Sequence, residues 1–206
     1  MDEEGLAALR SFVAHYAETP LAAPASYAMV DALRRTRALD EAESEATAFP
    51  RRFPESAFVD DALFFLMDTR LQKFEKAPTQ ASAAPVLESG DRLVKEQFPA
   101  PNGSKQWSEF APRAWHAIAR VRHVLGDLEG AITAYRNVGG NVEDAREALA
   151  YLTEARLDLQ ESVTAPVAGS ASFPVKYRNV GEIRFKAYPV DLQVLFAVRR
   201  TLEGLN

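Results

Sequence analysis

Basic side chains recur at three- and four-residue steps in the second half of the chain, at Arg113, His116, Arg120 and His123. Residues with this spacing share one face of an α-helix, so they predict a basic stripe. Guanidinium and imidazolium groups donate charge-assisted hydrogen bonds to carboxylates. The basic stripe therefore predicts a site for a peptide carboxylate or an acidic segment of a protein partner.

Metal binding is a weaker interpretation of the same residues. His116 and His123 are seven residues apart, whereas a helical zinc pair normally has a four-residue spacing and a further ligand nearby. His15 is distant in sequence. The acidic run 40–45 lacks the glycine of a calcium loop and is typical of a solvated helix face. We predict no metal site.

Catalytic motifs are also missing from the sequence. The chain has no cysteine and no Gly-x-Ser-x-Gly motif, and Gly139-Gly140 lacks the lysine and strand of a phosphate loop. Four phenylalanines could line an apolar pocket, but their helical spacing favours core packing; they are Phe58, Phe64, Phe65 and Phe74. We therefore predict a non-enzymatic protein without catalytic residues or cofactors.

Composition limits the partners further. The 206 residues are 47% apolar and carry a net charge of −5. From Val163 onward six Lys or Arg face three Asp or Glu, so the preceding part is strongly acidic and argues against nucleic-acid binding. No apolar run approaches the roughly 18 residues of a membrane span, so no membrane insertion is expected. Oligomeric state and compartment are left open.

The basic stripe belongs to an expected pair of helices at about residues 106–137. Gly126 ends the first helix and Asp127 caps the second. The apolar residues of each helix share one face and must pack on neighbours. They are Trp115, Ile118 and Ala119 in the first helix, then Ala131, Tyr135 and Val138 in the second.

This pair resembles a tetratricopeptide repeat in the order of its large, medium and small residues. The resemblance rests on Ala114-Trp115-His116-Ala117-Ile118-Ala119, then Gly126-Asp127, Ala131 and Tyr135. In that family helix hairpins stack, and the first helix of each hairpin lines a concave groove. The resemblance implies that the basic stripe faces such a groove.

A second copy of the pattern lies 52 positions earlier. Ser56-x-Phe58-x-x-x-Ala62-Leu63-x-x-Leu66-Met67 matches Ser108-x-Phe110-x-x-x-Ala114-Trp115-x-x-Ile118-Ala119. The same offset aligns Asp61 with Arg113 and Asp68 with Arg120, so neighbouring groove helices could pair these charges internally. Three interpretations stay open: internal neutralisation, which carries the most weight, a stripe that binds a ligand, and ordinary solvated charge.

Six further helices are expected along the first 161 residues. Ser26 and Ser56 are the expected N-caps of two of them, and residues 77–85 form a connector whose middle is an alternative helix start. A turn is expected at 99–104. The helices cover residues 3–17, 26–37, 39 to about 50, 56–76, 86–98 and 142–160, the first being a short amphipathic segment.

The tail has a different character. Residues 162–172 are rich in Ala, Gly, Ser and Pro and indicate a linker. Residues 173–180 and 182–189 alternate apolar and basic residues, which predicts a β-hairpin. Asp191 is the expected cap of a final helix, 192–202.

The tail is similar to a segment of bacterial alpha-2-macroglobulin-like proteins, on Val175-Lys176-Tyr177-Arg178-Asn179-Val180 and Ile183 to Leu192. In that family such strands follow a helical repeat region and open a macroglobulin-like β-sandwich. The resemblance implies an exported or periplasmic protein. If the chain is unrelated to that family, a cytoplasmic protein is expected. The family's reactive thioester needs a Cys-Gly-Glu-Gln motif, which this cysteine-free chain lacks.

Together these patterns predict a mainly α fold. An antiparallel helix-hairpin solenoid, residues 1–161, precedes a linker, 162–172, and a β-hairpin with a terminal helix, 173–206. The predicted function is a protein-interaction scaffold, the helical region of a larger macroglobulin-like protein. The alternatives are a stand-alone envelope assembly adaptor and a subunit of an enzyme complex.

Overall fold

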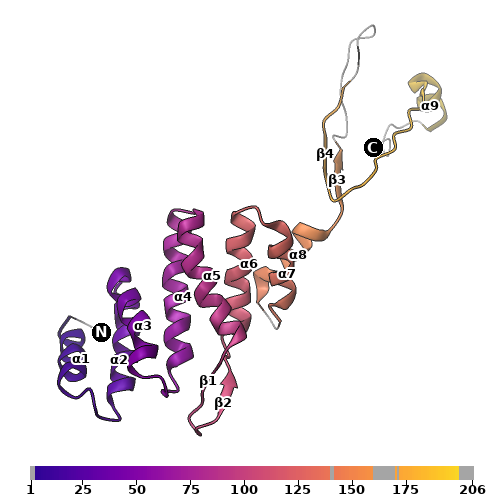
Figure 1. Ribbon diagram of the computed structural model, residues 1–206. Helices are drawn as coiled ribbons and strands as arrows, with labels where there is room; N and C mark the ends of the chain where they lie inside the picture. The colour runs from indigo at the N-terminus through magenta and orange to yellow at the C-terminus, as the bar shows by residue number, and fades with distance from the viewer. Residues whose placement is uncertain (1–2, 140–141, 160–169, 171, 200–206) are drawn as a thin grey trace. The chain divides into compact units, whose positions relative to one another are not determined.

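A computed structural model describes residues 3–139, 142–159, 170 and 172–199 of the chain. The chain divides into two compact units, Met1–Leu152 and Thr153–Asn206. The first unit is a row of antiparallel helices, and the second contains a small two-stranded sheet and a helix (Figure 1). The expected mainly helical, solenoid-like fold with a small C-terminal hairpin is confirmed.

The helices of the first unit follow one another in space in chain order (Figure 1). They are α1 (Glu3–His15), α2 (Ala22–Arg35), α3 (Leu39–Arg52), α4 (Val59–Lys76), α5 (Gln80–Lys95), α6 (Ala111–Val124), α7 (Leu128–Asn137) and α8 (Glu143–Thr153). A hairpin of β1 (Gln97–Pro99) and β2 (Lys105–Trp107) lies between α5 and α6.

In three helix pairs the two helices are joined by a turn of three residues: 36–38 joins α2 to α3, 77–79 joins α4 to α5, and 125–127 joins α6 to α7. Two of these turns have the same geometry, because Arg37 (φ 60°) and Gly126 (φ 81°) both adopt the left-handed conformation. The amide of the next residue then bonds back to Leu33 O or Arg122 O. As expected, Asp127 caps α7 by accepting a hydrogen bond from Gly130 N at 3.0 Å.

The expected 52-residue repeat is matched by equal geometry at the starts of α4 and α6. Ser56 Oγ accepts a hydrogen bond from Phe58 N at 3.2 Å, and Ser108 Oγ accepts one from Phe110 N at 3.1 Å. The prediction that Ser56 is the N-cap of α4 was nevertheless wrong, because its hydroxyl bonds within the turn that precedes the helix, which begins at Val59. Ser26 as N-cap was also wrong, since it lies inside α2 and is fully buried.

The middle of the array differs most from expectation. Helix α5 begins at Gln80, six residues before the main predicted start but near the alternative start in the middle of residues 77–85, because Thr79 and Ser82 form a reciprocal capping box and the helix continues through Pro85. It also ends earlier, so Phe98 belongs to β1, and Gln106 lies in β2 and not in the helix pair. The hairpin that these strands form was not predicted from the sequence.

A continuous apolar core joins the helices. Residues of α2 to α6 form its main part, and α6 to α8 form a second cluster around Ile118 and Tyr135. Trp115 lies at the edge of this second cluster and is half-buried. Helices α5 and α6 approach so closely at Gly90 that an added Cβ would lie 2.9 Å from Ile118 Cγ1. The repeat pattern therefore predicted the stacking correctly.

In the second unit, β3 (Arg156–Leu159) pairs antiparallel with β4 (Val175–Arg178). The predicted continuation of the last helix to residue 160 was wrong, since residues 156–159 alternate in the period of a strand. The predicted pairing of 173–180 with 182–189 was also wrong, because β3 takes the place of the second strand. Helix α9 (Leu192–Arg199) begins at the expected cap, Asp191. Most of the expected linker lies outside the described residues.

Candidate binding face

The first helices of the three pairs form one face of the array. The backbone of α4 lies close to both α2 and α6, and no comparable approach joins α3 to α5 or α5 to α7 among the described residues. A row of helices that is more tightly spaced on one side curves toward that side. We call the surface of α2, α4 and α6 the inner face.

Aromatic stacking joins α2 to α4 on this face. The Tyr27 ring lies between Phe58 and Phe65, at centroid distances of 4.9 and 5.5 Å and nearly parallel to both. The Tyr27 hydroxyl donates a hydrogen bond of 3.4 Å to Asp61. Burial and the nearby carboxylates of Asp61 and Asp31 raise the pKa of Tyr27 to about 12, so its hydroxyl stays a donor.

An arginine makes the next contact between the same two helices. The Arg34 guanidinium lies 4.6 Å from the centre of the Phe65 ring and 3.5 Å from Asp68 Oδ2. Tyr27 and Asp61, like Arg34 and Asp68, are 34 residues apart. Neither Tyr27 nor Arg34 was predicted from the sequence, although their equal spacing of 34 residues from Asp61 and Asp68 is a signal that could have found them.

The predicted basic stripe lies along α6. Its two arginines are exposed and its two histidines are half-buried. Arg113 lies over the Phe64 ring at 5.7 Å, and Phe64 in turn stacks on Phe110 at 4.4 Å. Arg113 has no carboxylate partner among the described residues, whereas Arg120 Nη2 pairs with Glu75 at 2.5 Å.

The predicted pairs Asp61–Arg113 and Asp68–Arg120 were therefore wrong in their partners. Asp61 and Asp68 face back to α2, where Tyr27 and Arg34 bind them. Burial raises the pKa of Asp61, and the neighbouring Asp60 raises it further. Internal neutralisation of the basic stripe is thus limited to Arg120, which Glu75 binds two helical turns beyond the predicted Asp68.

Aromatic rings flank the two histidines. His116 lies 6.0 Å from the Tyr135 ring, and His123 lies between Tyr135 and Tyr151, at 6.4 and 6.5 Å. Burial lowers the pKa of His116, and the charge of Arg120 lowers it further, so His116 is neutral at pH 7. The stripe therefore presents two guanidiniums and a neutral ring donor, which is less positive than the sequence indicated.

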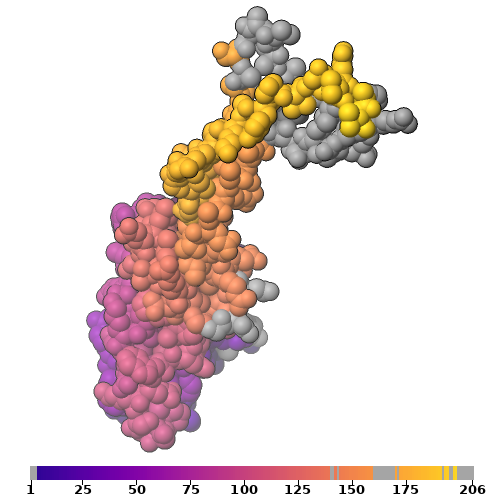
Figure 2. Space-filling model, turned by 90° about the vertical axis from the view of Figure 1, so that its right-hand side faces the viewer, coloured from indigo at the N-terminus to yellow at the C-terminus, as the bar shows by residue number. Residues whose placement is uncertain are grey.

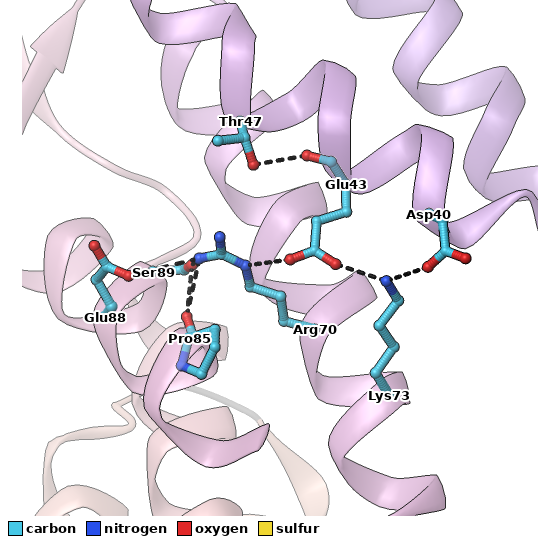
Figure 3. Close-up of polar contacts among 8 residues, drawn as sticks. All are labelled: Asp40, Glu43, Thr47, Arg70, Lys73, Pro85, Glu88 and Ser89. Atoms are coloured by element: carbon cyan, nitrogen blue, oxygen red, sulfur yellow. Dashed lines mark hydrogen bonds and ion pairs between the residues drawn. The ribbon is translucent and has the colours of Figure 1, made fainter. Parts of the chain in front are cut away.

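The other edge of α4 carries a polar network that was not predicted from the sequence (Figure 3). Arg70 donates to Glu43 at 2.9 Å, to Pro85 O at 3.1 Å and to Ser89 Oγ at 2.7 Å. Lys73 bridges Glu43 and Asp40 at 2.7 and 2.6 Å. These contacts join α3, α4 and α5, and they commit Nε and Nη1 of Arg70 to the fold.

The predicted core role of the four phenylalanines agrees with their burial. Phe74 is fully buried, and the other three pack half-buried against the main core. Within the described chain, no group of three or more His, Asp or Glu residues is arranged to hold a metal ion. In the same residues, no helix is long and apolar enough to cross a membrane.

Comparisons with protein-family models, with curated proteins and with solved structures gave no match for this chain. The chemistry of the inner face therefore rests on its own geometry. Figure 2 shows the first unit from the side of its later helices, with the colour changing from pink to orange along the chain. On α6 a ligand would meet an exposed guanidinium, stacked on an aromatic ring and near half-buried imidazoles.

Proposed function

We propose that the first unit is a non-enzymatic protein-interaction scaffold of the tetratricopeptide type, and that α6 binds an acidic segment of a protein partner. The observation that carries the proposal is the state of Arg113. Its guanidinium is exposed, is oriented by the Phe64 ring, and has no carboxylate partner in the described part of the chain. A guanidinium held by stacking keeps its donors free for a bidentate carboxylate.

Neighbouring groups extend this site along one helical face. Arg120 lies two turns beyond Arg113, and its pair with Glu75 is exposed at both partners, so an incoming carboxylate can compete for it at small cost. His116 lies between the two arginines and, being neutral, adds a hydrogen-bond donor without adding charge. Two helical turns span about 10.5 Å, so an extended segment with several acidic residues along it can reach both arginines.

The test is a binding titration with the full chain. The probe is a fluorescein-labelled ten-residue peptide of alternating Glu and Leu, compared with the same peptide in which Gln replaces Glu. Fluorescence anisotropy at low salt should show tighter binding of the acidic peptide. Arg113→Gln should weaken that binding about tenfold, the loss of one charge-assisted hydrogen bond or more.

The matched control is Arg136→Gln. Arg136 is an exposed arginine of α7, in the second layer of helices, so its loss removes the same charge away from the inner face. Binding should be unchanged in this variant. Equal binding of both peptides would show that the carboxylates are not recognised, and an equal loss in the Arg113 and Arg136 variants would show that the attraction is only general electrostatics.

A second role concerns the tail, and it follows the resemblance to macroglobulin-like proteins. Large apolar side chains of the second unit are exposed, including Tyr177 (64%), Phe185 (57%) and Tyr188 (75%). None of the described side chains from Thr153 to Val198 is buried. A two-stranded hairpin without a core is marginal in water, so this unit is proposed to belong to a larger β-module.

A further inference from the structure

A cavity of about 540 Å³ lies at the opposite end of the array from the basic stripe. It lies between the α1–α2 turn and the loop that joins α3 to α4. Its apolar lining comes from three prolines, two phenylalanines and two alanines, including Pro20, Pro54, Phe53 and Phe58. This volume is within the range of pockets that bind small molecules or side chains.

The polar groups of the lining show what an occupant must supply. The Thr19 hydroxyl donates to Tyr16 O at 2.8 Å, and Ser56 Oγ accepts from Phe58 N at 3.2 Å, so both neutral groups already have partners. Glu18 and Glu55 are exposed at the cavity and have no ion pair or hydrogen bond in the described residues. The groups that remain available to a ligand are therefore two negatively charged carboxylates, which accept hydrogen bonds.

No basic residue lines the cavity. The nearest arginine in sequence is Arg52, whose guanidinium lies 5.6 Å from the centre of the Phe53 ring and is paired with Glu45 at 3.2 Å. It is thus committed to a glutamate outside the cavity. The contact also shows that the Phe53 ring accepts a guanidinium on its face.

We propose that this cavity binds an arginine or lysine side chain, flanked by an apolar residue, in a basic segment of a partner protein. The aliphatic stem of such a side chain packs on the prolines and phenylalanines, while its charged group reaches Glu18 and Glu55. A neighbouring cavity of about 220 Å³ shares Pro54 and Glu55, but half of its lining is charged or polar and includes Arg92 and Lys105, so the flanking apolar residue packs on the prolines of the first cavity.

The cavity and the basic stripe on α6 share no residue, so the two sites are independent. An acidic segment at Arg113 and a basic segment at Glu18 and Glu55 could belong to one partner or to two. The inference does not depend on the proposed function: loss of binding at either site leaves the other intact.

The experiment is an NMR titration of the full chain with acetyl-Phe-Arg-Phe-amide and with acetyl-Phe-Gln-Phe-amide. The arginine peptide should shift the backbone amide signals of Thr19, Ala23, Ser56 and Phe58 in a saturable manner. The glutamine peptide should bind at least tenfold more weakly. The double variant Glu18→Gln/Glu55→Gln should lose the arginine preference, whereas Glu129→Gln, an exposed glutamate of α7, should retain it.

The proposal is overturned if the two peptides bind equally, or if the double variant keeps the arginine preference. It is also overturned if the shifted amides cluster at the acidic start of α4, around Asp60 and Asp61. Thermal melts of both variants establish whether they are folded. If the double variant is unfolded, the single variants Glu18→Gln and Glu55→Gln should each reduce the preference by at least threefold, and a preference unchanged in both overturns the proposal.

Discussion

Arg70 of α4 and Arg113 of α6 have different surroundings in the same array of helices. The side chain of Arg70 is only 16% exposed and donates to groups on both α3 and α5. Arg113 is exposed, contacts one aromatic ring and has no described carboxylate partner. The two residues have the same chemistry, and the difference lies in the number of helices that surround each.

Arg70 lies where three helices meet, so its Nε and Nη1 donate to acceptors on both α3 and α5 (Figure 3). Arg113 lies on the inner face, where only the neighbouring first helix is within reach, and there it meets Phe64. Charges between the layers are therefore used by the fold, whereas on the inner face Arg113 keeps its guanidinium free of a described carboxylate.

The largest expected effect is on stability. Arg70→Leu leaves Pro85 O and Ser89 Oγ without this donor and leaves Glu43 with only Lys73, which should lower the free energy of unfolding by about 2–4 kcal/mol. Arg113→Leu removes an exposed side chain and should change it by less than about 0.5 kcal/mol. Urea denaturation of both variants measures the difference.

Equal losses in the two variants would contradict the comparison, since they would give Arg113 a structural role. A further variant, Arg70→Lys, keeps the positive charge but cannot reach three acceptors at once. It should recover less than half of the stability that Arg70→Leu loses. Full recovery would mean that charge, and not the forked geometry of the guanidinium, joins the helices.

The sequence predicted the array well and the charge pairs poorly, for one physical reason. Apolar periodicity and turn residues such as Gly126 act within one helix or between adjacent helices, so the pattern of a short segment contains them. Asp61 and Arg113 were correctly placed on neighbouring first helices. Which of two neighbours a carboxylate faces depends on helix rotation and length, and α4 is four residues longer than α6.

The errors in the strands have a similar origin. Residues 156–159 follow a helical stripe, and only their alternation of charged and apolar residues indicates a strand. Strand β4 pairs with β3, which lies about twenty residues earlier in the chain. Local patterning does not determine such a distant pairing. Tyr27, Arg34 and Arg70 were missed because each looks ordinary alone and becomes informative only through its contacts with other helices.

The polar network around Arg70 and the basic stripe on α6 contain groups that titrate in different pH ranges. Burial alone would raise the pKa of Glu43, but hydrogen bonds from Lys73 and Arg70 outweigh burial and hold it below the ordinary 4.5. Burial and Arg120 hold the pKa of His116 below 6.5. For a group whose pKa is lowered by folding, the unfolded chain binds the proton first, so stability falls as pH falls through the folded pKa.

We therefore expect two losses of stability on acidification. The first begins below about pH 6.5 and reflects His116; the second begins below about pH 4.5 and reflects Glu43 together with Asp40, whose pKa Lys73 also lowers. His116→Gln should flatten only the first, and Glu43→Gln only the second, in urea denaturation followed from pH 8 to 3. A change in both windows from one variant would show that the two regions are coupled.

The smallest expected effect is the pair that Arg120 makes with Glu75. Both side chains are more than 40% exposed, so solvent screens their attraction, and a double-mutant cycle with Arg120→Gln and Glu75→Gln should give a coupling of about 0.2–1 kcal/mol. The coupling should decrease in 0.5 M salt, because exposed charges are screened within a few ångströms at that ionic strength. The same cycle on Arg70 and Glu43 should give a larger coupling that salt changes little, since both groups are more enclosed. A coupling at Arg120 as large and as salt-resistant as at Arg70 would mean that Glu75 is a fixed structural partner, and that only Arg113 remains for a ligand on α6.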